Sequence, residues 1–257
     1  MQLIDAVAPE TMAERARAGF VDVYGDQPQV VGRAPGRVNL IGEHTDYNGG
    51  LCLPVALPHA TYAACAARSD TRIRVSSARA GVWDGELADI APGAVGRGAL
   101  PGWAATSPEC RGRSARWAGR VWTSTSTDRR GRAVQFGCLG KCAVGIAWPR
   151  SCGLPDADEP SGDGRRVHPG GDRDRGAPTG GMDQAVSIFG HPDEAVLLDF
   201  LTGSRLRVPL HLAPHDLTLR RRHPGVARVA IDGGYAARRA DCDEAAGLGV
   251  DPRPRRP

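Results

Sequence analysis

The hydrophobic positions near the start of the chain follow two spacings, one typical of a helix and one of strands. Met12, Ala16 and Phe20 recur every four residues within Pro9–Tyr24, which predicts an amphipathic helix with a proline suited to its first turn. Short apolar runs bounded by Pro, Gly or Asp then predict strands. These runs are Gln29–Val31, Leu51–Leu57, Thr61–Ala67 and Thr71–Ser76.

The pattern changes at about residue 95. Residues 101–176 are rich in Arg, Gly, Pro, Ser and Asp and show little periodicity apart from the run Cys142–Ala147. Order returns after this segment, with strands expected at Val196–Phe200 and Leu206–Leu210 and a helix at Tyr235–Ala246. A stretch of this length without regular elements is unusual inside a compact domain.

Composition limits the kinds of function that this chain can have. It has 257 residues, of which 41% are hydrophobic, and this is enough to bury a core in one or two domains. Apolar residues never run together over the length that a membrane-spanning helix needs, and Met1–Asp5 lacks the basic and apolar regions of a signal peptide. We therefore expect a cytoplasmic protein with no membrane partner.

The net charge of +4 comes from one internal segment, because residues 101–176 hold thirteen basic and eight acidic residues. Such an excess is found in basic arms that bind RNA or an acidic partner. The segment lacks a basic helical face and interleaved aromatic residues, so nucleic acid is not an expected partner. The seven cysteines form no CxxC pair and no zinc-finger spacing with histidine, which indicates free thiols.

The densest group of polar side chains lies in Gly36–Gly50, where an apolar stretch leads directly into Glu43, His44, Thr45 and Asp46. This order places several hydrogen-bonding side chains at the end of a strand, where they can converge on one small polyhydroxyl ligand. The alternative is a solvated loop after a strand.

Two further strings contain candidate residues. In Gly176–Gln184, two glycines let the backbone approach a ligand just before the carboxylate of Asp183, although an aspartate in this position can also be a helix cap. In Asp232–Tyr235, followed by Arg238–Cys242, a tyrosine begins the predicted helix. A tyrosine in that position can equally pack in a core.

All three strings resemble those of galactokinases, which belong to the GHMP family of small-molecule kinases. The likeness covers about residues 1–95 and 176–217 well and 231–246 less closely. It implies an α+β fold with two domains and the active site between them. Residues 1–200 would form the N-terminal sugar and ATP domain, and 201–257 the start of a second domain that is largely missing.

The resemblance also implies an activity, the transfer of the ATP γ-phosphoryl group to the anomeric hydroxyl of α-D-galactose, giving galactose 1-phosphate with ATP and Mg²⁺. Asp183 would accept the proton of the hydroxyl, and Arg37 would hold that carboxylate ionised and stabilise the transition state. The residues that would bind the sugar are Glu43, His44, Thr45, Asp46, Gly181 and Tyr235. No metal ligands are identified.

The sequence departs from the family at the phosphate-binding loop, for which galactokinases have roughly Gly-Leu-Ser-Ser-Ser-Ala at a helix start. No such string is present, and the acidic partner of magnesium expected shortly before Gly176 is missing too. The codons of Arg132–Gly137, read one base later, can encode the missing string. Shifted frames also give strand-like text at Trp103–Cys110, Val121–Asp128 and Arg220–Val226.

These matches suggest a frame-damaged coding sequence over residues 101–175, with a truncated C-terminus. The alternative is a genuine Arg-rich insertion. We expect the chain as written to have no useful kinase activity, because ATP would lack its backbone amide cradle. Three other hypotheses remain: a non-catalytic galactose-binding protein or sensor, an inert pseudogene product, and another sugar kinase of the same family.

Overall fold

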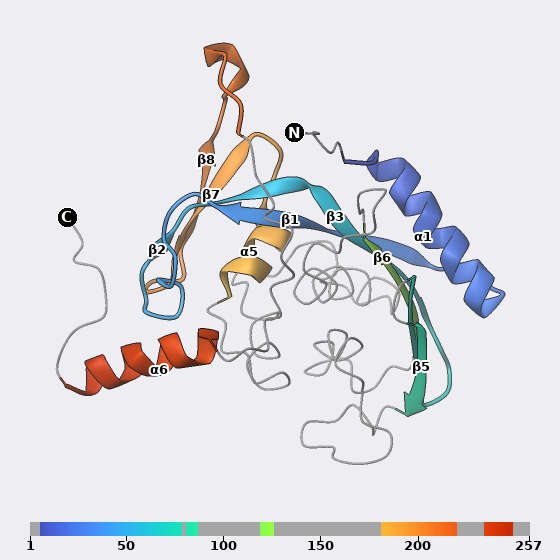
Figure 1. Ribbon diagram of the computed structural model, residues 1–257. Helices are drawn as coiled ribbons and strands as arrows, with labels where there is room; N and C mark the ends of the chain where they lie inside the picture. The colour runs from blue at the N-terminus through green and yellow to red at the C-terminus, as the bar shows by residue number, and fades with distance from the viewer. Residues whose placement is uncertain (1–5, 79–80, 87–118, 126–180, 220–233, 249–257) are drawn as a thin grey trace.

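The computed structural model of the chain describes residues 6–78, 81–86, 119–125, 181–219 and 234–248. The elements are α1 Pro9–Tyr24, β1 Val30–Asn39, β2 Leu51–Cys52, β3 Pro54–Ala67, β4 Arg72–Ser77, β5 Gly81–Glu86, β6 Gly119–Thr125, α5 Met182–Phe189, β7 Glu194–Asp199, β8 Arg205–Pro209, the 3-10 turn η4 Ala213–His215, and α6 Gly234–Gly247. The strands form one mixed sheet with α1 and α5 packed against it, and α6 lies apart from the sheet (Figure 1).

The sheet has eight strands, with β2, β7, β3, β6, β4 and β5 in that order, β1 paired with β3, and β8 paired with β7. Most pairs are antiparallel, whereas β6 runs parallel to β4. The segment from Ala60 to Ala66 of β3 is buried at every position, as expected of a strand with neighbours on both sides. The sheet continues past residue 200 through β8, and the division expected at that residue remains a prediction.

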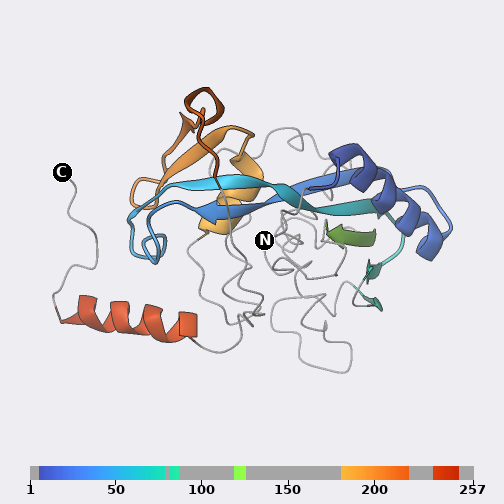
Figure 2. The ribbon, with the colours of Figure 1, turned by 45° about the horizontal axis from the view of Figure 1, so that its top comes forward.

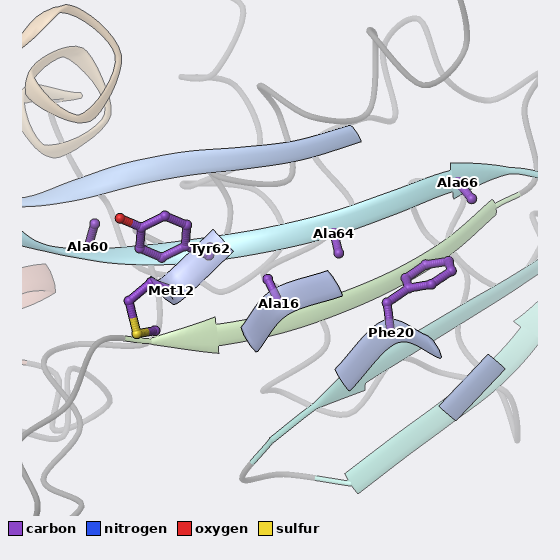
Figure 3. Close-up of a cluster of buried hydrophobic side chains, with 7 residues drawn as sticks. All are labelled: Met12, Ala16, Phe20, Ala60, Tyr62, Ala64 and Ala66. Carbon is purple, nitrogen blue, oxygen red and sulfur yellow. The ribbon is translucent and has the colours of Figure 1, made fainter. Parts of the chain in front are cut away.

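Helix α1 confirms the predicted Pro9–Tyr24 helix, including its proline start. It ends at Gly25, whose φ of 79° is left-handed and whose N–H donates to the carbonyl of Val21. Figure 3 shows that the buried face of this helix packs against β3. The side chains in this cluster are Met12, Ala16, Phe20, Ala60, Tyr62, Ala64 and Ala66.

The strand predictions were right in place but not in extent. The strand expected at Gln29–Val31 is the longer β1, because β1 pairs with β3 along nearly all of its length despite its glycines and proline. The separate strands expected on either side of Pro58 are joined in β3. The register between β1 and β3 shifts between Pro35 and Arg37, opposite the extra residues of β3 around Pro58, which is how a bulge accommodates a proline.

Strand β6 corrects the expectation that residues 101–176 lack regular elements apart from the run Cys142–Ala147. Val, Trp and Thr in Gly119–Thr125 suit a strand, and β3 and β4 supply partners on both sides. Strand β5 was not predicted either. The other three frame-shifted strings lie outside the described residues, so the reading-frame hypothesis remains a prediction that resequencing and peptide mass spectrometry would check.

A second core cluster joins α5 to the part of the sheet formed by β2 and β7. Met182 and Val186 of α5 pack there with Val196 and Leu198 of β7. The strands expected at Val196–Phe200 and Leu206–Leu210 are confirmed as β7 and β8, shifted by one or two residues. Among the described residues, no helix is long and apolar enough to cross a membrane.

Candidate functional site

The loop between β1 and β2 holds the polar string expected at a strand end, and Gly42 sets its path. The φ of Gly42 is +101°, and a Cβ there would collide with the carbonyl oxygen of Leu51 and lie 2.8 Å from Cα of Cys52. The loop doubles back closely, because the N–H of Leu53 donates to the carbonyl of Ile41 at 2.9 Å. Only glycine fits this approach.

The hydroxyl of Thr45 joins the two ends of this loop. Its hydroxyl lies 2.7 Å from the carbonyl oxygen of Gly42, 2.8 Å from that of Leu51 and 3.1 Å from Sγ of Cys52. A hydroxyl has one proton and two lone pairs, so these contacts compete with a sugar for it. Burial raises the pKa of the Cys52 thiol to about 11, so the thiol stays protonated beside Thr45. The expected contact between Thr45 and sugar remains a prediction.

Arg37 and Asp183, far apart in the sequence, form an ion pair. Nε of Arg37 donates to Oδ1 of Asp183 at 2.6 Å, and a terminal guanidinium nitrogen lies 2.5 Å from the same oxygen. The two side chains are 24% and 21% exposed, so the pair is shielded but reachable. Both of these contacts of Arg37 fall on Oδ1 of the carboxylate.

Helix α5 places Asp183 in its first turn, behind Gly181, whose φ of 101° is left-handed. The alternative role of Asp183 as a helix cap is not formed, because Gly181 is the N-cap residue and no side chain caps this helix. Ser187 fixes the helix against β1, because its buried hydroxyl lies 3.0 Å from the carbonyl oxygen of Pro35 and 2.8 Å from that of Asp183. The contact fixes α5 against Pro35, which precedes Arg37 by two residues in β1.

Asp46 is the one acidic side chain of the loop that is buried, at 8% exposure. Burial, followed by the nearby negative charge of Asp183, raises the pKa of Asp46 above its usual value, and hydrogen bonds from backbone N–H groups, including that of Met182, oppose the shift. The loop and the start of α5 thus meet at this carboxyl group. A buried carboxylate beside a second one suits a ligand with several hydroxyl groups.

Asp46→Asn is expected to raise the free energy of unfolding near neutral pH. Because the pKa of Asp46 is higher in the folded state, its contribution to stability is fully present below its unfolded pKa of 3.8 and is lost as pH rises through the folded pKa. The amide keeps the shape without the charge, so we expect a gain on the order of 1 kcal/mol at pH 7. Urea unfolding across acidic and neutral pH measures it. Asp84→Asn, in a surface ion pair with Arg72, is the control, and an equal gain there would contradict the assignment.

Glu43 and His44 are exposed and each has a partner nearby. Nδ2 of Asn39, the last residue of β1, donates to Oε1 of Glu43 at 3.3 Å. Nδ1 of His44 lies 2.6 Å from the hydroxyl of Tyr47. His44 has a φ of 61°, an uncommon conformation for a residue with a side chain, which is typical of functional loops.

Helix α6 confirms the helix predicted at Tyr235–Ala246, and Figures 1 and 2 both place it beside the β1–β2 loop. Sγ of Cys242 lies 3.4 Å from Nδ2 of Asn48, and the Arg239 guanidinium is 6.0 Å from the centroid of the Tyr47 ring. The side chain of Tyr235 lies outside the described residues, so its proposed contact with sugar remains a prediction.

Comparisons with known proteins agree on one family. A model described as the galactokinase galactose-binding signature matches residues 18–67. A galactokinase of Streptomyces coelicolor is 33% identical over 254 residues, which cover 94% of this chain and 62% of that protein. The chain is related to the galactokinases. A galactokinase of Chloroflexus aurantiacus is 55% identical over 60 residues, covering 23% of this chain and 15% of that protein.

The fold is similar to that of a solved structure. The crystal structure of Lactococcus lactis galactokinase complexed with galactose superposes with a TM-score of 0.66 at 20% identity, covering 91% of this chain and 62% of that chain. This likeness confirms the expected mixed α and β fold. The chain spans less than two thirds of the length of the Streptomyces and Lactococcus galactokinases, at 62% of each.

Three residues that contact the candidate site residues were not identified from the sequence. Ser187 lies one helical turn after Asp183, a spacing that could have indicated its position on the same face. Asn39 and Tyr47 lie inside the matched string, but nothing in their types or spacing indicated which residue each would contact. Among the described cysteines, Cys52 and Cys242 are free thiols as expected.

Proposed function

We propose that this chain binds α-D-galactose at the β1–β2 loop and that the site is that of a galactokinase, which phosphorylates the anomeric hydroxyl. The observation that carries the proposal is the ion pair between Arg37 and Asp183, located beside the buried carboxyl of Asp46. Glu43 and His44 project from the same loop and would bind further hydroxyl groups of the sugar.

In this reaction, Asp183 acts on the proton of the anomeric hydroxyl. Its Oδ1 is held by Arg37, and Oδ2 would accept the proton as the sugar oxygen forms a bond to the γ-phosphorus of ATP. The bond from that phosphorus to the bridging oxygen breaks, and ADP leaves with the electron pair. Arg37 would also offset negative charge on the phosphoryl group, which suits a reaction that depends on positioning and charge stabilisation.

No residue is assigned to the ATP phosphates or to Mg²⁺. Across the described ranges, no group of three or more His, Cys, Asp or Glu side chains could hold a metal ion. When bound, Mg²⁺ would neutralise charge on the transferred phosphoryl group. The described residues account for the sugar side of the reaction only.

A second candidate function is a galactose-binding protein without kinase activity. It is favoured by one observation: Glu43, His44 and Asp46 belong to one loop, whereas the written sequence has no Gly-Leu-Ser-Ser-Ser-Ala string for the phosphates. Such a protein would bind galactose at the β1–β2 loop without transferring a phosphoryl group to it.

Calorimetric titration of the purified 257-residue chain with galactose, together with an assay of galactose-dependent ADP release, tests both functions. Galactose binding with ADP release supports the kinase, and binding without release supports the binding protein. Glucose, which differs at one hydroxyl group, is the control ligand. A folded chain that fails to bind galactose in the titration would contradict both functions.

A further inference from the structure

The contact between His44 and Tyr47 joins two side chains of the β1–β2 loop. The hydroxyl of Tyr47 lies 2.6 Å from Nδ1 of His44, and the two rings meet edge to face with centroids 5.8 Å apart. The separation is shorter than the range of about 2.7–3.2 Å in which N–H···O hydrogen bonds fall, and it suits an O–H donor. A phenol is also a better donor than acceptor, because its oxygen shares a lone pair with the ring.

The surroundings of Tyr47 keep its hydroxyl protonated. Burial, then the nearby Cys242 and Asp46, raises the pKa of Tyr47, and the charges of Arg239 and Arg238 oppose the shift. A neutral imidazole next to a protonated phenol has one nitrogen as acceptor and the other as donor.

We propose that Tyr47 is a positioning residue for His44: its hydroxyl donates to Nδ1 and thereby holds the proton of the imidazole on Nε2, where it is presented to a hydroxyl oxygen of galactose. The inference rests on the proposed function for the choice of ligand, and it adds the residue that sets the tautomer of His44. A histidine that binds a ligand through one nitrogen commonly has its tautomer set by a hydrogen bond at the other.

The loop and α6 hold Tyr47 in place for this role. Nδ2 of Asn48 donates to the carbonyl oxygen of His44 at 2.8 Å, which fixes the backbone of the histidine in its left-handed conformation. The same amide lies 3.4 Å from Sγ of Cys242, and Arg239 lies over the Tyr47 ring. The phenol is therefore packed between the histidine and a helix.

Nitrogen-15 NMR of the ligand-free protein labelled at histidine tests the proposal directly. At pH 8, we expect His44 to show an unprotonated Nδ1 and a protonated Nε2. The spectrum of His44→Gln assigns the signals. Tyr47→Phe removes only the hydroxyl and should shift His44 toward a mixture of tautomers.

Tyr24→Phe is the matched control, because the Tyr24 hydroxyl donates to Oγ of Ser76 at 2.9 Å, away from the loop, and its loss should leave the His44 signals unchanged. Thermal unfolding shows whether each variant is folded. Galactose affinity should fall about fivefold in Tyr47→Phe, as for the loss of one hydrogen bond of roughly 1 kcal/mol. In a protein that already carries His44→Gln, adding Tyr47→Phe should not lower the galactose affinity further.

Two results would overturn the proposal: a proton on Nδ1 of His44 in the parent, or His44 signals that are the same in Tyr47→Phe and the parent. Both results come from NMR spectra recorded in the absence of galactose. A parent chain that shows the expected tautomer but does not bind galactose would contradict the proposed function and leave the positioning of His44 by Tyr47 supported.

Discussion

Asp183→Asn, made in a version of the chain in which the Gly-Leu-Ser-Ser-Ser-Ala string is restored, is expected to lower kcat for galactose-dependent ADP release by roughly 10²–10⁴, the usual contribution of a general base. The amide keeps the size of the carboxylate and can still accept a hydrogen bond from Arg37 through its oxygen, but it cannot take up the proton of the sugar. Galactose affinity should change little, because the loop side chains would make most of the contacts with the sugar. Steady-state assays and calorimetry on the same preparations separate the two effects.

The same variant has a readout that does not depend on turnover. The charge of Asp183 raises the pKa of Asp46, so removing that charge should lower the pKa of Asp46, which carbon-13 NMR of the side-chain carboxyl follows. Asp84→Asn, which breaks a surface ion pair with Arg72, should change neither value. Near-normal turnover in Asp183→Asn, or an unchanged pKa of Asp46, would contradict the site as described.

Gly42→Ala is expected to destabilise the protein by about 3 kcal/mol or more and to abolish galactose binding. The added methyl group would meet backbone atoms of Leu51 and Cys52, which belong to β2 and cannot move without breaking its pairing with β7. The left-handed φ of +101° adds strain for any side chain. Urea unfolding and calorimetric titration with galactose measure the two effects.

Gly25→Ala is the matched control for this substitution. Gly25 has a left-handed φ of +79°, but nothing lies within 4 Å of a Cβ placed there. Its replacement should cost only the conformational strain, about 1–2 kcal/mol. If the two variants lose the same stability, the close approach of Gly42 to Leu51 is not what requires glycine in the loop.

Elements with a strong local pattern could be predicted from sequence. Helix α1 has apolar residues at helical spacing, a proline at its start and a glycine at its end, and all three signals agree with the structure. The full length of β1 could not be predicted, because Gly and Pro interrupt its pattern and its pairing with β3 outweighs them. Strand β6 could not be predicted either, because its two partners, β3 and β4, lie far from it in the sequence.

The candidate site shows the same limit. The resemblance already joined Arg37 to Asp183, as the group that would hold its carboxylate ionised, and each string carries its own signal. Their ion pair spans 146 positions and depends on the packing of α5 against β1, which no local pattern encodes. Hydrogen bonds between polar neighbours, such as those of Thr45 with the loop carbonyls, depend on side-chain direction and could not be inferred from residue types.

The position of β6 makes the β4–β5 hairpin depend on a distant part of the chain. Among the strands that the structure describes, β4 and β5 reach the rest of the sheet only through β6. Until β6 is synthesised and docked, the backbone edges of β3 and β4 have no partner there, and open strand edges promote aggregation. Any change of sequence that displaces Gly119–Thr125 would therefore act first on the yield of folded protein in the cell, through capture by chaperones or deposition as insoluble material.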